Sequence, residues 1–135
     1  MPDLGRLTVL IVDDNPRMRA LLRAFIAAIE VKAIYEASDG QTGLETFRRS
    51  TCDLILCDMT MKPMDGLEFT RRVRNSEERF NPSAPIVMVS GHTEKHCVEA
   101  ARDAGVSEFL AKPVTAQALF ARIAEIVERP RPFVR

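Results

Sequence analysis

The feature that most constrains this chain is a fivefold alternation of strand-like and helix-like segments. Short apolar runs predict strands at residues 7–12, 32–37, 53–57, 86–90 and 108–111. Helical spacing of apolar residues follows each run: from Pro16, around Leu44 and Phe47, at 66–74, from about 94 to 104, and around Ile123. Strands that alternate with helices imply an α/β fold, with a parallel sheet covered by helices on both faces.

Composition restricts the classes of partner. The chain has 135 residues, of which 46% are hydrophobic and 28% charged, as expected of one globular domain. Lys plus Arg equals Asp plus Glu at 19 each, which favours neither direct nucleic-acid binding nor a membrane partner. The N-terminus resembles no signal peptide, and the three cysteines lack CxxC spacing, so we expect a cytoplasmic protein with reduced thiols.

The domain is expected to span residues 1–128. Residues 129–135, with the sequence RPRPFVR, are predicted to form a tail or linker, because Pro130 and Pro132 are incompatible with a continuing helix. Such a Pro-rich end is also compatible with a linker into a further domain.

Polar residues follow four of the five predicted strands. Asp13 and Asp14 follow the first strand, Asp58 the third, and Lys112 the fifth, while Ser90 ends the fourth. The carboxyl ends of parallel strands meet at one edge of the sheet, where ligands of such folds bind. Three carboxylates placed together repel one another, so Lys112 and a divalent cation, most plausibly Mg²⁺, are expected among them.

This set of residues resembles the response-regulator receiver domain of two-component signalling. The resemblance rests on Asp13-Asp14 after an apolar strand, on Asp58 followed by MTMKPMDG, on Ser90, and on Lys112-Pro113. It covers about residues 6–128 and implies a CheY-like, flavodoxin-like (βα)5 fold, doubly wound with strand order 2-1-3-4-5. It also implies that the protein is a signalling switch that catalyses only its own phosphorylation and dephosphorylation.

The resemblance assigns roles to the strand-end residues. Asp58 would be the nucleophile that accepts a phosphoryl group. Asp13, Asp14, Asp58 and the backbone carbonyl of Thr60 would hold Mg²⁺. Lys112 would neutralise charge in the transition state, positioned by Pro113, whose preceding peptide bond is often cis in the family.

The resemblance further implies a switch. Ser90 would donate a hydrogen bond to the phosphoryl group, and Phe109 would move into the space that Ser90 vacates. The side chains of Thr60 and His92 would flank the phosphoryl group and set its lifetime. The fourth helix offers mainly alanines for burial, so its position should shift easily.

The implied partners are a histidine kinase, a phosphotransfer protein or a small phosphodonor. A downstream protein would read the face formed by the fourth helix, the fifth strand and the fifth helix. The chain would be a monomer or a phosphorylation-dependent dimer. Alternatively, it would be the receiver piece of a longer regulator with a DNA-binding or enzymatic output domain. The family usually places proline four residues after its phospho-accepting aspartate, whereas here Lys62 stands there and Pro63 follows, so this loop departs from the pattern.

Other interpretations of single residues remain open. Asp13 and Asp14 could stabilise a helix N-terminus, Ser90 could begin a turn, and Lys112 could be a surface lysine. His92 and His96 have i, i+4 spacing, yet the HExxH order of a zinc protease is absent. An aspartyl-phosphate phosphatase of the haloacid dehalogenase type is disfavoured, because it needs DxD and Thr60 replaces the second aspartate.

Overall fold

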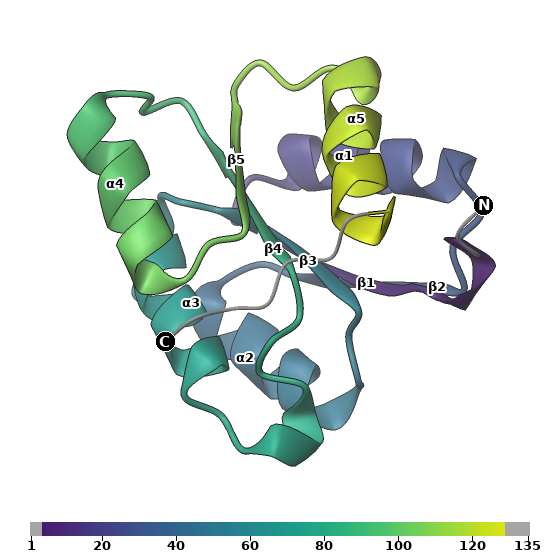
Figure 1. Cartoon of the computed structure of the whole chain (residues 1–135), viewed down its shortest axis with the longest axis horizontal. Coiled ribbons are helices and arrows are strands. Elements are labelled where there is room, and N and C mark those ends of the chain that lie inside the picture. The colour runs from purple at the N-terminus through teal and green to yellow at the C-terminus, as the bar shows by residue number, and fades with distance from the viewer. Residues whose placement is uncertain (1–3, 129–135) are drawn as a thin grey trace.

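The computed structural model describes residues 4–128, and the predicted tail at 129–135 lies outside the described residues. Strands and helices alternate along these residues (Figure 1). The strands are β1 (Thr8–Val12), β2 (Ala33–Ala37), β3 (Leu54–Asp58), β4 (Ile86–Ser90) and β5 (Glu108–Ala111). The helices are α1 (Pro16–Ala28), α2 (Gly40–Arg49), α3 (Gly66–Arg74), α4 (Lys95–Ala104) and α5 (Ala116–Glu128), with short 3-10 turns η1 (Leu4–Arg6) and η2 (Glu78–Phe80).

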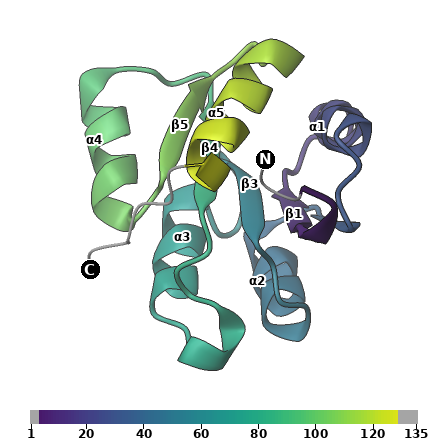
Figure 2. The same ribbon diagram turned by 45° about the vertical axis from the view of Figure 1, so that its right-hand side comes forward.

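The five strands form one parallel sheet in the order β2-β1-β3-β4-β5, which confirms the expected flavodoxin-like topology. Helices α1 and α5 cover one face, and α2, α3 and α4 cover the other (Figure 2). Every residue of β3 and β4 is buried, as expected of strands covered on both faces. β2 is an edge strand, which agrees with its more polar sequence.

Apolar side chains on the two faces of the sheet form separate cores. Alternate residues of each strand point to opposite faces, so neighbouring β1 residues divide between the cores. Leu10 and Val12 pack with α2 and α3, whereas Val9 and Ile11 pack with α1 and α5. The sheet is thereby held from both sides, which fixes the positions of its strand ends.

Local sequence sets the helix ends. The Asn15 side chain accepts hydrogen bonds from the backbone N–H groups of Arg17 and Met18, and Pro16 occupies the first helical position, as predicted. Gly105 ends α4 in the left-handed conformation with φ 111°, which glycine adopts without steric cost. α1 and α4 therefore begin and end close to where their sequence signals indicate.

Differences from the sequence-based expectations are small. β3 runs one residue later than predicted, so that Asp58 is its last residue and the Asp53 side chain instead accepts a hydrogen bond from Thr8 N–H at 2.8 Å. Glu94 occupies the residue position just before α4, without a capping hydrogen bond from its side chain, rather than belonging to the helix. The polar segment between α3 and β4 contains η2, which the sequence did not indicate. Within residues 4–128, no helix has the length and hydrophobicity that crossing a bilayer requires.

Candidate functional site

The predicted polar residues meet at the carboxyl edge of the sheet. β1 and β3 are in register at Val12 and Cys57, so the residues that follow them, Asp13 and Asp58, come side by side. Asp58 is in turn paired with Val89, next to Ser90. Oxygen atoms of Asp13, Asp14 and Asp58 all lie within 4.8 Å of one another. The structure thus brings together the three carboxylates that the sequence placed at this edge.

Asp13 is the most buried of the three, with no exposed surface, whereas Asp58 is 5% exposed and Asp14 is exposed. Asp13 Oδ1 accepts a hydrogen bond from Asn15 N–H at 2.8 Å. Asp13 Oδ2 is buried and has no hydrogen-bond partner among the described residues, 4–128. A buried carboxylate oxygen without a donor is costly in free energy, so this atom fits a site for a cation.

Electrostatics at Asp13 support the same conclusion. Burial raises the pKa of the Asp13 carboxyl above its ordinary value, and repulsion from Asp58 and Asp14 raises it further. The hydrogen bond from Asn15 and the charge of Lys112 act in the opposite direction without cancelling the rise in pKa. A hard divalent cation with oxygen ligands would relieve this repulsion, and Mg²⁺ commonly binds through a few carboxylates.

Lys112 directly contacts Asp58. Its Nζ donates to Asp58 Oδ1 at 3.1 Å, and the lysine side chain is 28% exposed. The Lys112 backbone N–H donates to the Ser90 carbonyl at 2.8 Å, and the peptide bond between Lys112 and Pro113 is cis. The backbone hydrogen bond to Ser90 places Lys112 beside the end of β4, and its side chain reaches the Asp58 carboxylate from the end of β5.

Ser90 is buried, with 1% of its surface exposed. Its Oγ accepts a hydrogen bond from His92 N–H at 2.9 Å. The acceptors nearest to the hydroxyl, Met59 Sδ and the His92 carbonyl, are both 3.5 Å away and therefore weak. The hydroxyl proton is thus available to a stronger acceptor. Met59 was not singled out from the sequence; its position directly after Asp58 was the signal that could have indicated it.

Phe109 lies in β5 opposite Met88 and is partly buried. It packs against a small core of Met59, Met88 and Ala101 beneath α4. Met59 therefore contacts both Ser90 and the cluster that contains Phe109. The side chains of Thr60 and His92, predicted to flank a phosphoryl group, are exposed at the same edge of the sheet.

The loop after Asp58 approaches the site closely. A Cβ atom on Gly66 would contact the Asp58 carbonyl oxygen and lie 2.9 Å from Met59 Cα, so only glycine fits there. Met61 is buried, Lys62 is exposed, and the Lys62–Pro63 peptide bond is cis. Sequence reasoning missed Gly66, although its position at the start of the helix after Asp58 was visible.

Comparisons with known proteins agree with this geometry. A sequence model described as the response regulator receiver domain matches residues 9–124. The chemotaxis protein CheY of Pseudomonas aeruginosa is 33% identical over 121 residues, which are 90% of this chain and 96% of CheY. The cyclic di-GMP phosphodiesterase response regulator RpfG of Xanthomonas campestris is 36% identical over 128 residues, 93% of this chain but 33% of RpfG.

Among solved structures, the receiver domain of the sensor histidine kinase PA1611 from Pseudomonas aeruginosa matches with a TM-score of 0.78. The identity is 25%, and the match covers 90% of this chain and 97% of that one. Strand order and strand-end residues together define a CheY-like signalling switch with a flavodoxin-like fold. The chain belongs to the response regulator receiver domain family.

Proposed function

We propose that this chain is a phospho-accepting receiver in which Asp58 is the acceptor. The observation that carries the proposal is the contact of Asp58 with Lys112 inside a cluster of three carboxylates at the carboxyl edge of the sheet. Membership of the receiver family supports it. The phosphodonor would be a histidine kinase, a phosphotransfer protein or a small phosphodonor.

In the proposed reaction, an oxygen of the Asp58 carboxylate attacks the phosphorus atom of the donor. A new O–P bond forms, and the bond from phosphorus to the donor's leaving atom breaks, which returns its electron pair to the donor. The product is an acyl phosphate on Asp58. Lys112 Nζ, 3.1 Å from Asp58 Oδ1, would neutralise charge that develops on the phosphoryl oxygens.

Asp13, Asp14, Asp58 and the backbone carbonyl of Thr60 would hold Mg²⁺ in this proposal. The unpartnered oxygen of Asp13 supports a cation at this place. The receiver domain of PA1611 has a magnesium ion coordinated in its active-site cleft. When bound, Mg²⁺ would neutralise the carboxylates and the phosphoryl oxygens as a Lewis acid.

The switch would begin at Ser90, whose hydroxyl has only weak acceptors at 3.5 Å. The hydroxyl would donate a hydrogen bond to the phosphoryl oxygens. Phe109 would then move, because Ser90 contacts Met59 and Phe109 packs against the same small core. The exposed side chains of Thr60 and His92 would control the approach of water to the acyl phosphate, and thereby its lifetime. Pro113 would hold Lys112 in position.

A downstream protein would bind the face formed by α4, β5 and α5, and the chain would be a monomer or a phosphorylation-dependent dimer. The protein would act in the cytoplasm. A second arrangement, in which the domain (1–128) continues into an output domain, is supported by the match to one third of RpfG.

The test is incubation with acetyl phosphate and Mg²⁺, followed by intact mass measurement. We expect a single phosphoryl adduct in the parent protein, which should not form when EDTA replaces Mg²⁺ and should be absent from Asp58→Asn. Asp53→Asn is the matched control, because Asp53 precedes the same strand at its other end and an amide oxygen can still accept from Thr8 N–H. Absence of an adduct from the parent, or an adduct that persists in Asp58→Asn, would refute the proposal.

A further inference from the structure

Arg74, the last residue of α3, is a buried cation that the proposed phosphoryl chemistry does not use. Only 3% of its surface is exposed. Arginine is rarely buried to this extent, because removing a guanidinium from water is unfavourable unless hydrogen bonds replace its hydration. The buried guanidinium of Arg74 is therefore expected to donate hydrogen bonds to fixed acceptors inside the fold.

The guanidinium of Arg74 joins two other segments to α3. Its Nε donates to the Gly105 carbonyl at 2.9 Å, and its Nη2 donates to Ser107 Oγ at 3.3 Å, both in the turn between α4 and β5. Its Nη1 donates to the carbonyls of Pro82 at 2.8 Å and Ala84 at 2.6 Å, just before β4. Arg74 thus holds the C-terminal end of α4 against the start of β4.

The two ends of α4 are held very differently. In the C-terminal half, Ala101 and Ala104 are buried, and the N–H of Gly105 donates to carbonyls of the last turn. At the N-terminal end, the Glu94 side chain caps no backbone N–H, and residues 91–96 are all exposed. Free energy of local opening should therefore be lower at the N-terminal end.

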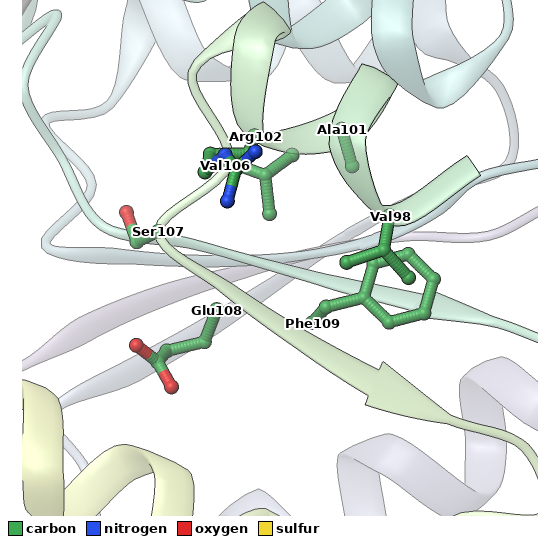
Figure 3. Close-up of a pocket in the computed structure, with 7 residues that line it drawn as sticks. All are labelled: Val98, Ala101, Arg102, Val106, Ser107, Glu108 and Phe109. Atoms are coloured by element: carbon green, nitrogen blue, oxygen red, sulfur yellow. The ribbon is translucent and has the colours of Figure 1, made fainter. Parts of the chain in front are cut away.

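The connection to the candidate site also differs between the two ends of α4. A hollow of about 220 Å³ lies between α4 and β5, and Figure 3 shows Val98 of α4 and Phe109 of β5 among the side chains that line it; most of the others belong to the C-terminal part of α4 and the turn that follows it. The segment that leads into α4 starts at Ser90, whose Oγ accepts from His92 N–H. The loosely held end of α4 is therefore the end connected to the proposed phosphorylation site.

We propose that Arg74 is a positioning residue for the switch: it clamps the C-terminal end of α4, so that phosphorylation tilts the helix about Gly105. Movement is then largest over residues 91–100 and small over residues 101–107. This inference rests on the proposed function, because it takes phosphorylation of Asp58 as the event that moves the helix. It assigns the coupling to a residue at the opposite end of the strands from Asp58.

The experiment is hydrogen exchange of the backbone amides with and without acetyl phosphate and Mg²⁺, with the phosphoryl adduct measured by intact mass in the same samples. In the parent, exchange over residues 91–100 should change on phosphorylation and exchange over 101–107 should not. Arg74→Lys keeps the charge but cannot reproduce the planar fork of donors. In this variant, phosphorylation should also change the exchange of the amides at residues 101–107, with a change in exchange rate of roughly tenfold.

Two further variants separate a clamp from a merely structural role. Arg72→Lys is the matched control, since Arg72 lies on the exposed side of α3 and pairs with Glu68; it should behave as the parent. Ser107→Ala removes one acceptor of Arg74, which is also the acceptor of Ile86 N–H, and should extend the change in the same direction, even if Arg74→Lys does not fold. If Arg74 had only a structural role, its replacement would alter hydrogen exchange equally with and without phosphorylation. The change in exchange that phosphorylation causes would then be the same as in the parent.

The outcomes distinguish this inference from the proposed function. If the parent forms no adduct, the proposed function is overturned, and the role of the Arg74 clamp in switching is overturned as well. An adduct accompanied by an equal change along 91–107 would overturn the clamp alone. The clamp would also be overturned if Arg74→Lys and Ser107→Ala form the adduct and the change in hydrogen exchange stays confined to residues 91–100.

Discussion

At the scale of single residues, Asp13 shows how the site departs from what stability alone would select. Its carboxylate is fully buried, one oxygen has no partner among the described residues, and two more carboxylates lie close by. Burial and repulsion both raise the pKa of Asp13. In a metal-free protein, such a group lowers the free energy of unfolding whenever it is ionised.

We predict that Asp13→Asn increases stability in the absence of metal. An amide of the same shape carries no charge to desolvate, and it can still accept from Asn15 N–H, so the melting temperature in EDTA at pH 7 should rise by several degrees. The additional stabilisation that Mg²⁺ gives to the parent should shrink or vanish in the variant. Thermal unfolding with EDTA and with Mg²⁺ measures both effects, and Asp103→Asn on the exposed side of α4 is the control.

The stabilisation should also depend on pH in a defined direction. The pKa of Asp13 in the folded protein lies above the ordinary value of 3.8, so the folded state retains the proton more strongly than the unfolded state. The advantage of the Asp13→Asn variant over the parent should therefore be complete above the raised pKa and disappear as the pH falls toward 3.8. A metal-free Asp13→Asn protein that is less stable than the parent at pH 7 would contradict this account.

Sequence reasoning identified which residues gather at the site, because parallel strands bring their carboxyl ends to one edge. It could not show that Asp13 is buried while Asp14 is exposed, since both follow the same strand. It also could not show the contact of Met59 with Ser90, or the burial of Arg74. Those features depend on how loops pack over the strand ends, and a periodic pattern does not specify loop packing.

At the scale of elements, the junction between β3 and α3 determines the position of Asp58. Gly66 begins α3 and its N–H donates to the Met59 carbonyl at 2.9 Å. A side chain there would contact the backbone of Asp58 and Met59, and would lie 3.0 Å from Met88 Sδ. The first turn of α3 therefore packs directly against the residue proposed to accept the phosphoryl group.

We predict that Gly66→Ala destabilises the protein by roughly 1–3 kcal/mol, as overpacking commonly does, despite the better helix propensity of alanine. The displaced backbone of Asp58 should also slow formation of the phosphoryl adduct. Gly91→Ala is the matched control, because an added Cβ there meets no atom within 4 Å. Urea denaturation measures the stability of both variants; equal midpoints for the two would show that the close approach of Gly66 is not required.

Elements were predicted well where they have strong local signals and less well where they do not. The Asn15 cap and the Gly105 end could be identified from residue type, and α3 begins and ends as predicted at Gly66–Arg74. The path of the loop after Asp58 could not be predicted from residue type, because the spacing of Lys62 and Pro63 departs from the family pattern. The Lys62–Pro63 peptide bond in this loop is cis. Either isomer of an X–Pro bond is compatible with the same sequence, and the surrounding packing decides between them.

At the scale of the whole molecule, the sheet forms a single body covered on both faces. The apolar runs of the strands predicted this double covering, whereas the strand order came from the resemblance to receiver domains rather than from periodicity. Cys52 and Cys57 both lie in the core between the sheet and helices α2 and α3, and neither is exposed. Cys97 of α4 is only half-buried.

The three thiols therefore give a test of how cooperatively this body unfolds. Cys52 and Cys57 have no exposed surface, and burial raises the pKa of Cys52 to about 12 and that of Cys57 well above its ordinary value. The pKa of Cys97 is raised as well, so its exposure is what makes this thiol the accessible one. We predict that an alkylating reagent modifies Cys97 alone in the native protein, and all three cysteines in denaturant. Modification of Cys52 and Cys57 should require global unfolding, occur at a common slow rate, and become slower still with Mg²⁺.

Peptide mass mapping over time identifies which thiol has reacted. A Cys97→Ala variant should show no early modification, which would assign the rapid phase to α4. Cys57 lies next to Asp58 at the end of a fully buried strand. If Cys57 reacted as fast as Cys97 in the folded parent, the end of β3 would open locally without global unfolding. The strand would then not be the rigid support for Asp58 that the proposed phosphoryl transfer requires, since that reaction depends on fixed positioning of its groups.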